Sequence, residues 1–213
     1  MFEDFSLFFK KYSEDILIDG EPSKGYWSNL SKEENFELIN DLNQNTTKEI
    51  IKKKKPILFD MIFSEQRAIG LELLKLKGNE NLIDLGCMWG ALTIPASKQV
   101  KSVLGVDQTM ESLIFSNQRA KEENLNNIKF LNADIRKVNL PNIFDVAIIN
   151  GVLSKNSLLK LRDNGRKKYI RLMIAPVMRV HLLGYMLTER VIGKTRLMLH
   201  FHEESTHKEV TTI

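Results

Sequence analysis

The sequence has little of the residues that mark special protein classes: one cysteine, Cys87, with 11 glycines and 5 prolines among 213 residues. A single cysteine excludes an intramolecular disulfide framework and any multi-cysteine zinc or iron–sulfur site. No apolar run has the roughly 20 residues of a membrane-spanning helix. The acidic start at residues 1–5 lacks the basic-then-apolar order of a secretory signal. We therefore expect a cytoplasmic protein without membrane contact.

The composition is that of a globular protein, with 43% hydrophobic and 27% charged residues. This length suits one full domain and a modest extension. Charge is uneven along the chain: residues 1–150 hold 19 Lys and Arg against 22 Asp and Glu, whereas residues 151–213 hold 12 against 5. The basic last third fits an anionic substrate, nucleic acid or a solvated basic face.

Two capping boxes indicate helix starts in the N-terminal part of the chain. Ser31 precedes Glu34, and Thr46 precedes Glu49, at the spacing in which each side chain bonds the other's backbone amide. We predict that residues 1–59 form a helical cap or extension.

A third helix is expected after the second capping box. The second helix runs into lysines 52–55 and Pro56, a basic and then helix-breaking end that favours a solvated helix terminus. Apolar residues at mainly helical spacing then predict a helix from about 60 to 77, closed by Gly78.

From residue 82 onward, short apolar runs alternate with helical segments. A helix is expected to begin near Gly90, and another covers 110–123. Alternation of strand and helix predicts an α/β fold, a doubly wound, mostly parallel Rossmann-like sheet in residues 60–213. The predicted buried strands are 82–83, 103–106, 128–131 and 146–149.

Polar residues follow these predicted strands. Asp84 ends the first strand and Gly86 lies in the turn that leads to the next helix. Asp107 ends the second strand, where an acid can accept hydrogen bonds from a ribose diol. Asp134 follows the third strand and Asn150 ends the fourth. Each residue alone is more typical of a helix cap, but the ordered set points to a ligand site at one edge of the sheet.

This ordered set, over about residues 60–153, resembles the class I S-adenosylmethionine-dependent methyltransferases. The resemblance implies that the first turn holds the methionine part of the cofactor, that the second acid binds the ribose, and that the third acid recognises the adenine. It implies the following cofactor-binding residues: Asp84, Gly86, Cys87, Gly90, Asp107, Gln108, Ala133, Asp134, Ile135 and Asn150.

The glycine spacing argues against a nicotinamide-binding Rossmann domain, which needs Gly-x-Gly-x-x-Gly to seat a pyrophosphate. Here the turn reads Gly86-Cys-Met-Trp-Gly90. Met88 stands where the methyltransferase family usually has Gly or another small residue, so its side chain either folds away from the cleft or crowds the cofactor. Trp89 is interpreted as a packing residue.

The resemblance predicts an enzyme that transfers a methyl group from S-adenosylmethionine to a small-molecule acceptor. The segment Asn150-Gly-Val-Leu153 lacks the Pro-Pro-aromatic pattern of enzymes that methylate amino groups in nucleic acid. Two alternatives stay open: a nucleic-acid methyltransferase, and a non-catalytic cofactor-binding or interaction module of the same fold. The sequence assigns no catalytic base, no metal site and no oligomeric state.

The last third matches the family pattern less well. We expect a helix over 158–179 and a loop and strand over 181–193, and residues 196–201 and 209–213 can form a last antiparallel pair only if both strands are short. A complete domain and one that is incomplete or altered at its carboxyl end both stay open. The basic cluster at 162–171 is interpreted as a solvated helix face, since its charges spread around the helix. The histidines between 200 and 207 are interpreted as a polar terminus and not as metal ligands.

Overall fold

The computed structural model describes residues 5–20, residues 31–150 except 136 and 142, and four later strands. No helix in these parts is long and apolar enough to cross a membrane. The helices are α1 (Lys32–Asp41), α2 (Thr47–Lys54), α3 (Pro56–Phe63), α4 (Thr93–Ser97) and α5 (Met110–Glu122), with 3₁₀ segments η1 (Phe5–Leu7) and η2 (Glu65–Leu74). The strands are β1 (Lys10–Lys11), β2 (Ile16–Ile18), β3 (Asn81–Leu85), β4 (Ser102–Asp107), β5 (Ile128–Asn132), β6 (Val146–Asn150), β7 (Arg171–Ala175), β8 (Gly184–Val191), β9 (Lys194–Phe201) and β10 (Val210–Thr211).

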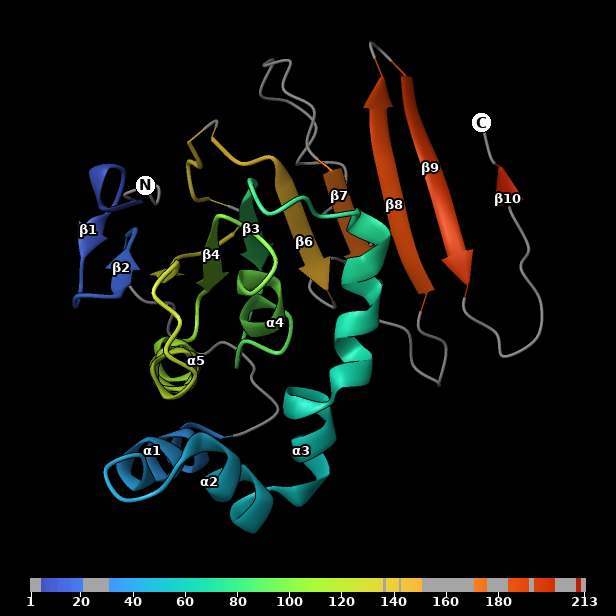
Figure 1. The fold of residues 1–213 in the computed structure, drawn as a ribbon. Helices are drawn as coiled ribbons and strands as arrows, with labels where there is room; N and C mark the ends of the chain where they lie inside the picture. The colour runs from blue at the N-terminus through green and yellow to red at the C-terminus, as the bar shows by residue number, and fades with distance from the viewer. Residues whose placement is uncertain are drawn as a thin grey trace.

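These strands form a single sheet in the order β1-β2-β5-β4-β3-β6-β7-β8-β9-β10. The six strands from β2 to β7 pair in parallel, whereas β1 and the three strands from β8 to β10 pair antiparallel at the two edges. The predicted α/β fold with a mostly parallel Rossmann-like sheet is confirmed. Figure 1 shows α1, α2 and α3 beyond the ends toward which the β3, β4 and β6 arrows point.

The sheet is buried on both faces at its centre, where all five residues of β3 are buried. One face packs against apolar residues of η2, α4 and α5, such as Leu71, Ile94 and Leu113. The other face packs against Phe5 and other residues of the N-terminal segment and of the loop before β6. Because neighbouring strand residues point to opposite faces, the central strands read as continuous apolar runs in the sequence.

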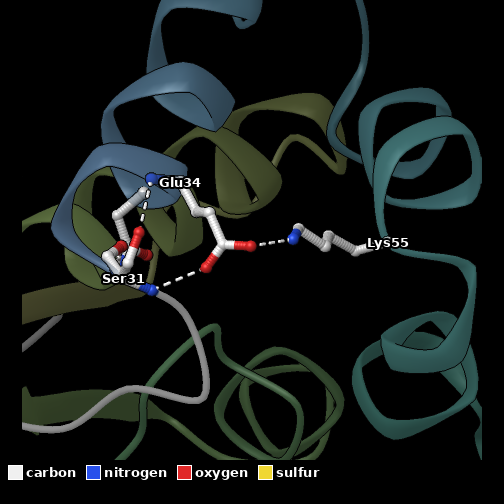
Figure 2. Close-up of polar contacts among 4 residues, drawn as sticks. Ser31, Glu34 and Lys55 are labelled. Atoms are coloured by element: carbon white, nitrogen blue, oxygen red, sulfur yellow. Dashed lines mark hydrogen bonds and ion pairs between the residues drawn. The ribbon is translucent and has the colours of Figure 1, made fainter.

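Both predicted capping boxes are present. The Ser31 hydroxyl accepts a 3.1 Å hydrogen bond from the Glu34 amide, and the Glu34 carboxylate accepts a 2.7 Å bond from the Ser31 amide. Figure 2 shows that the same carboxylate also pairs with Lys55 at the end of α2. Thr46 and Glu49 bond in the same reciprocal way. The box at Ser31 therefore starts α1 and also ties α1 to the end of α2.

Residues 5–18 differ from the helical extension that we predicted. They contain two short strands, of which β2 pairs in parallel with β5 and extends the central sheet. The signal was only three apolar residues long at 16–18, too short to separate a strand from a helix turn. Pairing with β5 buries Ile16 and Leu17 of β2. This tertiary contact stabilises a strand that the local sequence alone does not specify. The division of the chain near residue 59 stays a prediction.

The predicted helix over 60–77 is two elements in the structure. Pro56 is the first residue of α3, which ends at Phe63, and Ser64 then adopts an extended conformation with φ −66° and ψ 127°. The following η2 segment ends at Leu74, and the left-handed φ of 47° at Lys75 closes it three residues before the predicted stop at Gly78. The helix expected from Gly90 starts only at Thr93, because Gly90 itself has a φ of +73°.

The last third was predicted less well. Residues 171–175 form β7, paired in parallel with β6, where we had predicted the end of a helix. The strand expected within 181–193 is β8, and the expected antiparallel pair at the carboxyl end is β9 with β10. The remainder of the predicted 158–179 helix, most of its basic cluster and the histidines at 202 and 207 lie outside the described residues.

Candidate functional site

The turn after β3 has an unusual backbone. Gly86, Met88 and Gly90 all have left-handed φ angles, of 82°, 43° and 73°. The amides of Gly86 and Cys87 both donate to the Val106 carbonyl, at 2.7 and 3.1 Å, so the turn is fastened to β4. Glycine adopts such angles without strain, whereas a residue with a side chain costs about 1 kcal/mol or more. Met88 is therefore a strained position inside this turn.

The Met88 side chain packs against a cluster of apolar residues from the N-terminal helices. This cluster includes Ile51 and Ile62 of α2 and α3, and Trp89 is buried within it. Met88 also lines the cleft described below. Met88 therefore contacts the helices and also faces the cleft, so both alternatives for its side chain stay open, whereas Trp89 is buried in this cluster as a packing residue.

Two residues of α5 hold the turn from behind. The Ser116 hydroxyl donates a 2.7 Å hydrogen bond to the Met88 carbonyl, and the guanidinium of Arg119 donates to the Trp89 carbonyl. Arg119 also lies 4.4 Å from the centre of the Phe63 ring in α3. Burial lowers the pKa of Arg119 to about 10, which leaves it a cation at neutral pH. Arg119 thus links the turn to α3.

Gly90 packs closely against the helices that follow it. A Cβ atom at this position would lie 3.1 Å from Cγ1 of Ile94 and 3.4 Å from the Ser116 hydroxyl. Gly90 is not among the residues that line the cleft. The geometry therefore accounts for this glycine by backbone conformation and close packing.

Asp84 is a buried carboxylate, 3% exposed, at the carboxyl end of β3. The Thr93 hydroxyl donates a 2.6 Å hydrogen bond to its Oδ2. Burial raises the pKa of Asp84 to about 7, the Thr93 hydrogen bond opposes this rise, and the charge of Asp107 adds to it. Asp84 therefore changes protonation near neutral pH unless a cation binds beside it.

Asp107 is equally buried at the end of β4. Its Oδ2 accepts a 2.9 Å hydrogen bond from the Met88 amide, and its Oδ1 accepts one of 2.9 Å from the Thr109 amide. Burial raises its pKa, and these backbone amides oppose the rise. The two amides therefore fix the orientation of the Asp107 carboxylate at the end of β4.

A cleft opens at the carboxyl ends of β3 and β6, between the glycine turn and the N-terminal helices. Its lining from the turn and the strands consists of Asp84, Gly86, Cys87, Met88, Trp89, Ala91, Leu92 and Asn150. Met61, Ile62 and Arg67 line its other side. The structure therefore brings together four of the predicted site residues, namely Asp84, Gly86, Cys87 and Asn150, and joins Asp107 to them through the Met88 amide.

The remaining predicted residues lie along the neighbouring strand ends and do not line this cleft. Ala133 donates a 3.0 Å backbone hydrogen bond to Asp107, which places the end of β5 beside the end of β4. The Asp134 carbonyl accepts from the amides of Lys137 and Val138, in a turn that Ile135 shares. Gln108 directly follows Asp107 and is partly buried. Their assigned contacts with a cofactor stay predictions.

Sequence reasoning missed the side of the cleft formed by α3 and η2. Arg67 was hidden in what read as one continuous helix, and only the break at Ser64 brings its side chain to the Met61 carbonyl, 2.8 Å away. A basic residue in a helical pattern gives no signal of such a position. Cys87 lines the cleft as a thiol, because burial raises its pKa well above the usual value. Among the described residues, no group of His, Cys, Asp and Glu could hold a metal ion.

Comparisons with known proteins agree with the family resemblance found in the sequence. A family model described as a methyltransferase domain matches residues 76–181. An uncharacterized RNA methyltransferase of Nostoc is 32% identical over 88 residues, 39% of this chain and 19% of the relative. The ribosomal RNA small subunit methyltransferase A of Wigglesworthia glossinidia brevipalpis is 32% identical over 108 residues, 48% of this chain and 40% of the relative.

A third relative is the 23S rRNA (uracil(1939)-C(5))-methyltransferase of Pasteurella multocida, 34% identical over 65 residues. That match covers 30% of this chain and 15% of the relative, so the matches span between 15% and 40% of the length of these curated relatives. Among solved structures, a putative S-adenosyl-L-methionine-dependent methyltransferase of Methanococcus maripaludis has 20% identity and a TM-score of 0.49, covering 71% of this chain and 68% of its own.

Proposed function

Because this chain belongs to the class I S-adenosylmethionine-dependent methyltransferases, we propose that it transfers the methyl group of this cofactor to a small-molecule acceptor. The observation that carries the proposal is the cleft between the glycine turn and α3. Its far side is formed by Met61 and Ile62, with Arg67 as the charged residue. A mostly apolar cleft with few polar groups is typical of a small-molecule site.

The residues present fit the cofactor. The backbone of Gly86 and the carboxylate of Asp84 lie in the cleft, where the methionine part would bind. Asp107 is held by two backbone amides at the next strand end, the position from which an acid accepts the ribose hydroxyls. In this proposal the ends of β4 and β5, with Gln108 and Asp134, hold the adenine.

When bound, the cofactor supplies an already activated methyl group on its sulfonium. The chain has to align the acceptor in line with that methyl group and keep water out, which is a task for the apolar lining around Ile62 and Leu92. Asn150, at the end of β6, offers an amide that can orient the acceptor atom. A general base is required only for a weakly nucleophilic acceptor, and we assign none.

An RNA base is the second candidate acceptor. The observation that favours it is that all three named relatives carry the name of RNA methyltransferases, and two of them of ribosomal RNA methyltransferases. A bound RNA would make several phosphate contacts, so its affinity would fall steeply with added salt. A small molecule held in the cleft would show a weaker dependence on salt.

Calorimetric titration of the chain with S-adenosylhomocysteine, with NAD as a control ligand, tests the cofactor. Saturable binding of the first ligand alone supports the proposal, and absence of binding by a folded chain contradicts it. Methyl transfer from radiolabelled cofactor is then measured with pooled metabolites and with total RNA. Label found in RNA and not in small molecules would identify RNA as the acceptor in place of a small molecule.

A further inference from the structure

We propose that Arg67 binds the carboxylate of the cofactor's methionine part while Asp84, in the same cleft, binds its ammonium group. This inference rests on the proposed function and adds to it a residue that the resemblance does not supply. It assigns to α3 and η2 a part in recognising the cofactor as well as the acceptor.

The described lining of the cleft includes one group of each charge. Arg67 is the cation and Asp84 the carboxylate among the described residues of the lining. Within the described part of the chain Arg67 makes no ion pair, and its recorded side-chain partner is the Met61 carbonyl. A zwitterionic amino-acid group carries the two charges that would satisfy both residues, in the cleft that already includes the glycine turn.

The local backbone positions Arg67 for this role. Met61 and Arg67 are six residues apart, which would separate them by about 9 Å along a continuous helix. The chain instead breaks at Ser64, whose carbonyl accepts from the Arg67 amide at 3.3 Å. The 2.8 Å hydrogen bond to Met61 uses one of the guanidinium's donors and fixes its orientation. Four N–H donors remain, enough for a bidentate contact with a carboxylate.

The state of Asp84 supports the other half of the proposal. Its carboxylate is buried, its Oδ2 accepts from Thr93, and the described structure places no cation beside it. Burial raises its pKa to about 7, so the free protein holds it partly protonated at neutral pH. A bound ammonium group supplies the missing counter-charge and favours the ionised form.

The test compares two ligands that differ only in the carboxylate of the methionine part. Binding of S-adenosylhomocysteine is compared by calorimetry with binding of its decarboxylated analogue, which keeps the ammonium group. We expect Arg67→Gln to weaken S-adenosylhomocysteine about 10- to 100-fold, as for loss of a charged hydrogen-bonded pair. The same substitution should change affinity for the analogue less than about threefold, and Arg67→Lys should lie between the wild type and Arg67→Gln.

Lys98→Gln is the matched control, because this exposed lysine pairs with Glu123 and does not line the cleft. It should leave both affinities unchanged. The inference is overturned if wild type binds S-adenosylhomocysteine but Arg67→Gln weakens both ligands equally or neither. If the wild type binds neither ligand, the proposed function itself is contradicted. This outcome differs from the one that overturns only the role of Arg67. Thermal unfolding of each variant confirms that the chains compared are folded.

Discussion

The glycine turn and the N-terminal helices face each other across the cleft, but different forces hold them in place. The turn is fixed mainly by hydrogen bonds, from Gly86 and Cys87 to β4, from Met88 to Asp107, and from Ser116 to the turn. Helices α1 to α3 meet the turn through an apolar cluster, and their polar ties, such as Glu34 to Lys55 and Thr47 to Glu122, join them to one another and to α5. The turn should therefore respond to changes of polar groups and the helices to changes of volume.

The largest effect should come from the polar side. Replacing Asp107 by Ala leaves the amides of Met88 and Thr109 without their acceptor and removes the predicted ribose contact. We expect affinity for S-adenosylhomocysteine to fall about 100-fold or more, since each charged hydrogen bond contributes roughly 1.5–3 kcal/mol. Calorimetric titration measures the loss.

Asp145→Ala is the control for this prediction. Asp145 accepts a 3.0 Å hydrogen bond from the Asn81 amide, at the amino end of the strands and away from the cleft. It should lower stability with little change in ligand affinity. Equal loss of affinity in the two variants would mean that Asp107 acts only through folding.

The apolar side should lose stability when volume is removed. Ile51 is fully buried in the cluster that joins the helices to the turn. Ile51→Ala should lower the free energy of unfolding by about 2–4 kcal/mol, from lost transfer energy and the cavity left behind. Ile57→Ala, at a position 89% exposed, should cost under about 0.5 kcal/mol.

Hydrogen exchange sharpens this prediction. If the helices form a separate unit, Ile51→Ala accelerates amide exchange in α1 and α2 and leaves β3 and β4 protected. Uniform acceleration across the sheet would show instead that the helices and the sheet unfold together.

The sequence predicted the sheet side better than the helical side for a physical reason. Strands β3 to β6 are buried on both faces, so their apolar runs and the polar residues that end them can be identified without tertiary contacts. The helical side depends on a backbone break at Ser64, which no proline or glycine marks in the sequence. It also depends on which apolar residues come into contact across that break. Arg67 could not be predicted, because that break determines its position.

The raised pKa of the buried Asp84 carboxylate should make the stability of the chain depend on pH. Its folded pKa of about 7 exceeds the ordinary value of 3.8, so the folded chain binds more protons than the unfolded chain between these pH values. Stability therefore falls as pH rises through this window and levels off above it. Asp84→Asn keeps an acceptor for Thr93 and lacks this penalty.

We expect Asp84→Asn to be more stable than wild type by about 1–3 kcal/mol at pH 8.5, with the difference vanishing near pH 4. Urea unfolding at a series of pH values measures it. The same variant should bind S-adenosylhomocysteine more weakly, because it has lost the carboxylate that faces the ammonium group. A stability difference that is independent of pH would contradict the raised pKa.

The smallest effect concerns a residue of α5 that contacts both regions. Arg119 donates to the Trp89 carbonyl in the turn and lies over the Phe63 ring in α3. If this residue couples the regions, a double-mutant cycle of Arg119→Met and Phe63→Leu should give an interaction energy of about 0.5–1 kcal/mol. Urea unfolding of the wild type, both single variants and the double variant measures it. Phe59→Leu replaces Phe63→Leu in a control cycle, since Phe59 contacts the Phe63 ring and not, in the described contacts, the guanidinium. A coupling near zero in the first cycle would leave the hydrogen bond to Trp89 as the sole role of Arg119, and the turn and the helices would then be joined by apolar packing alone.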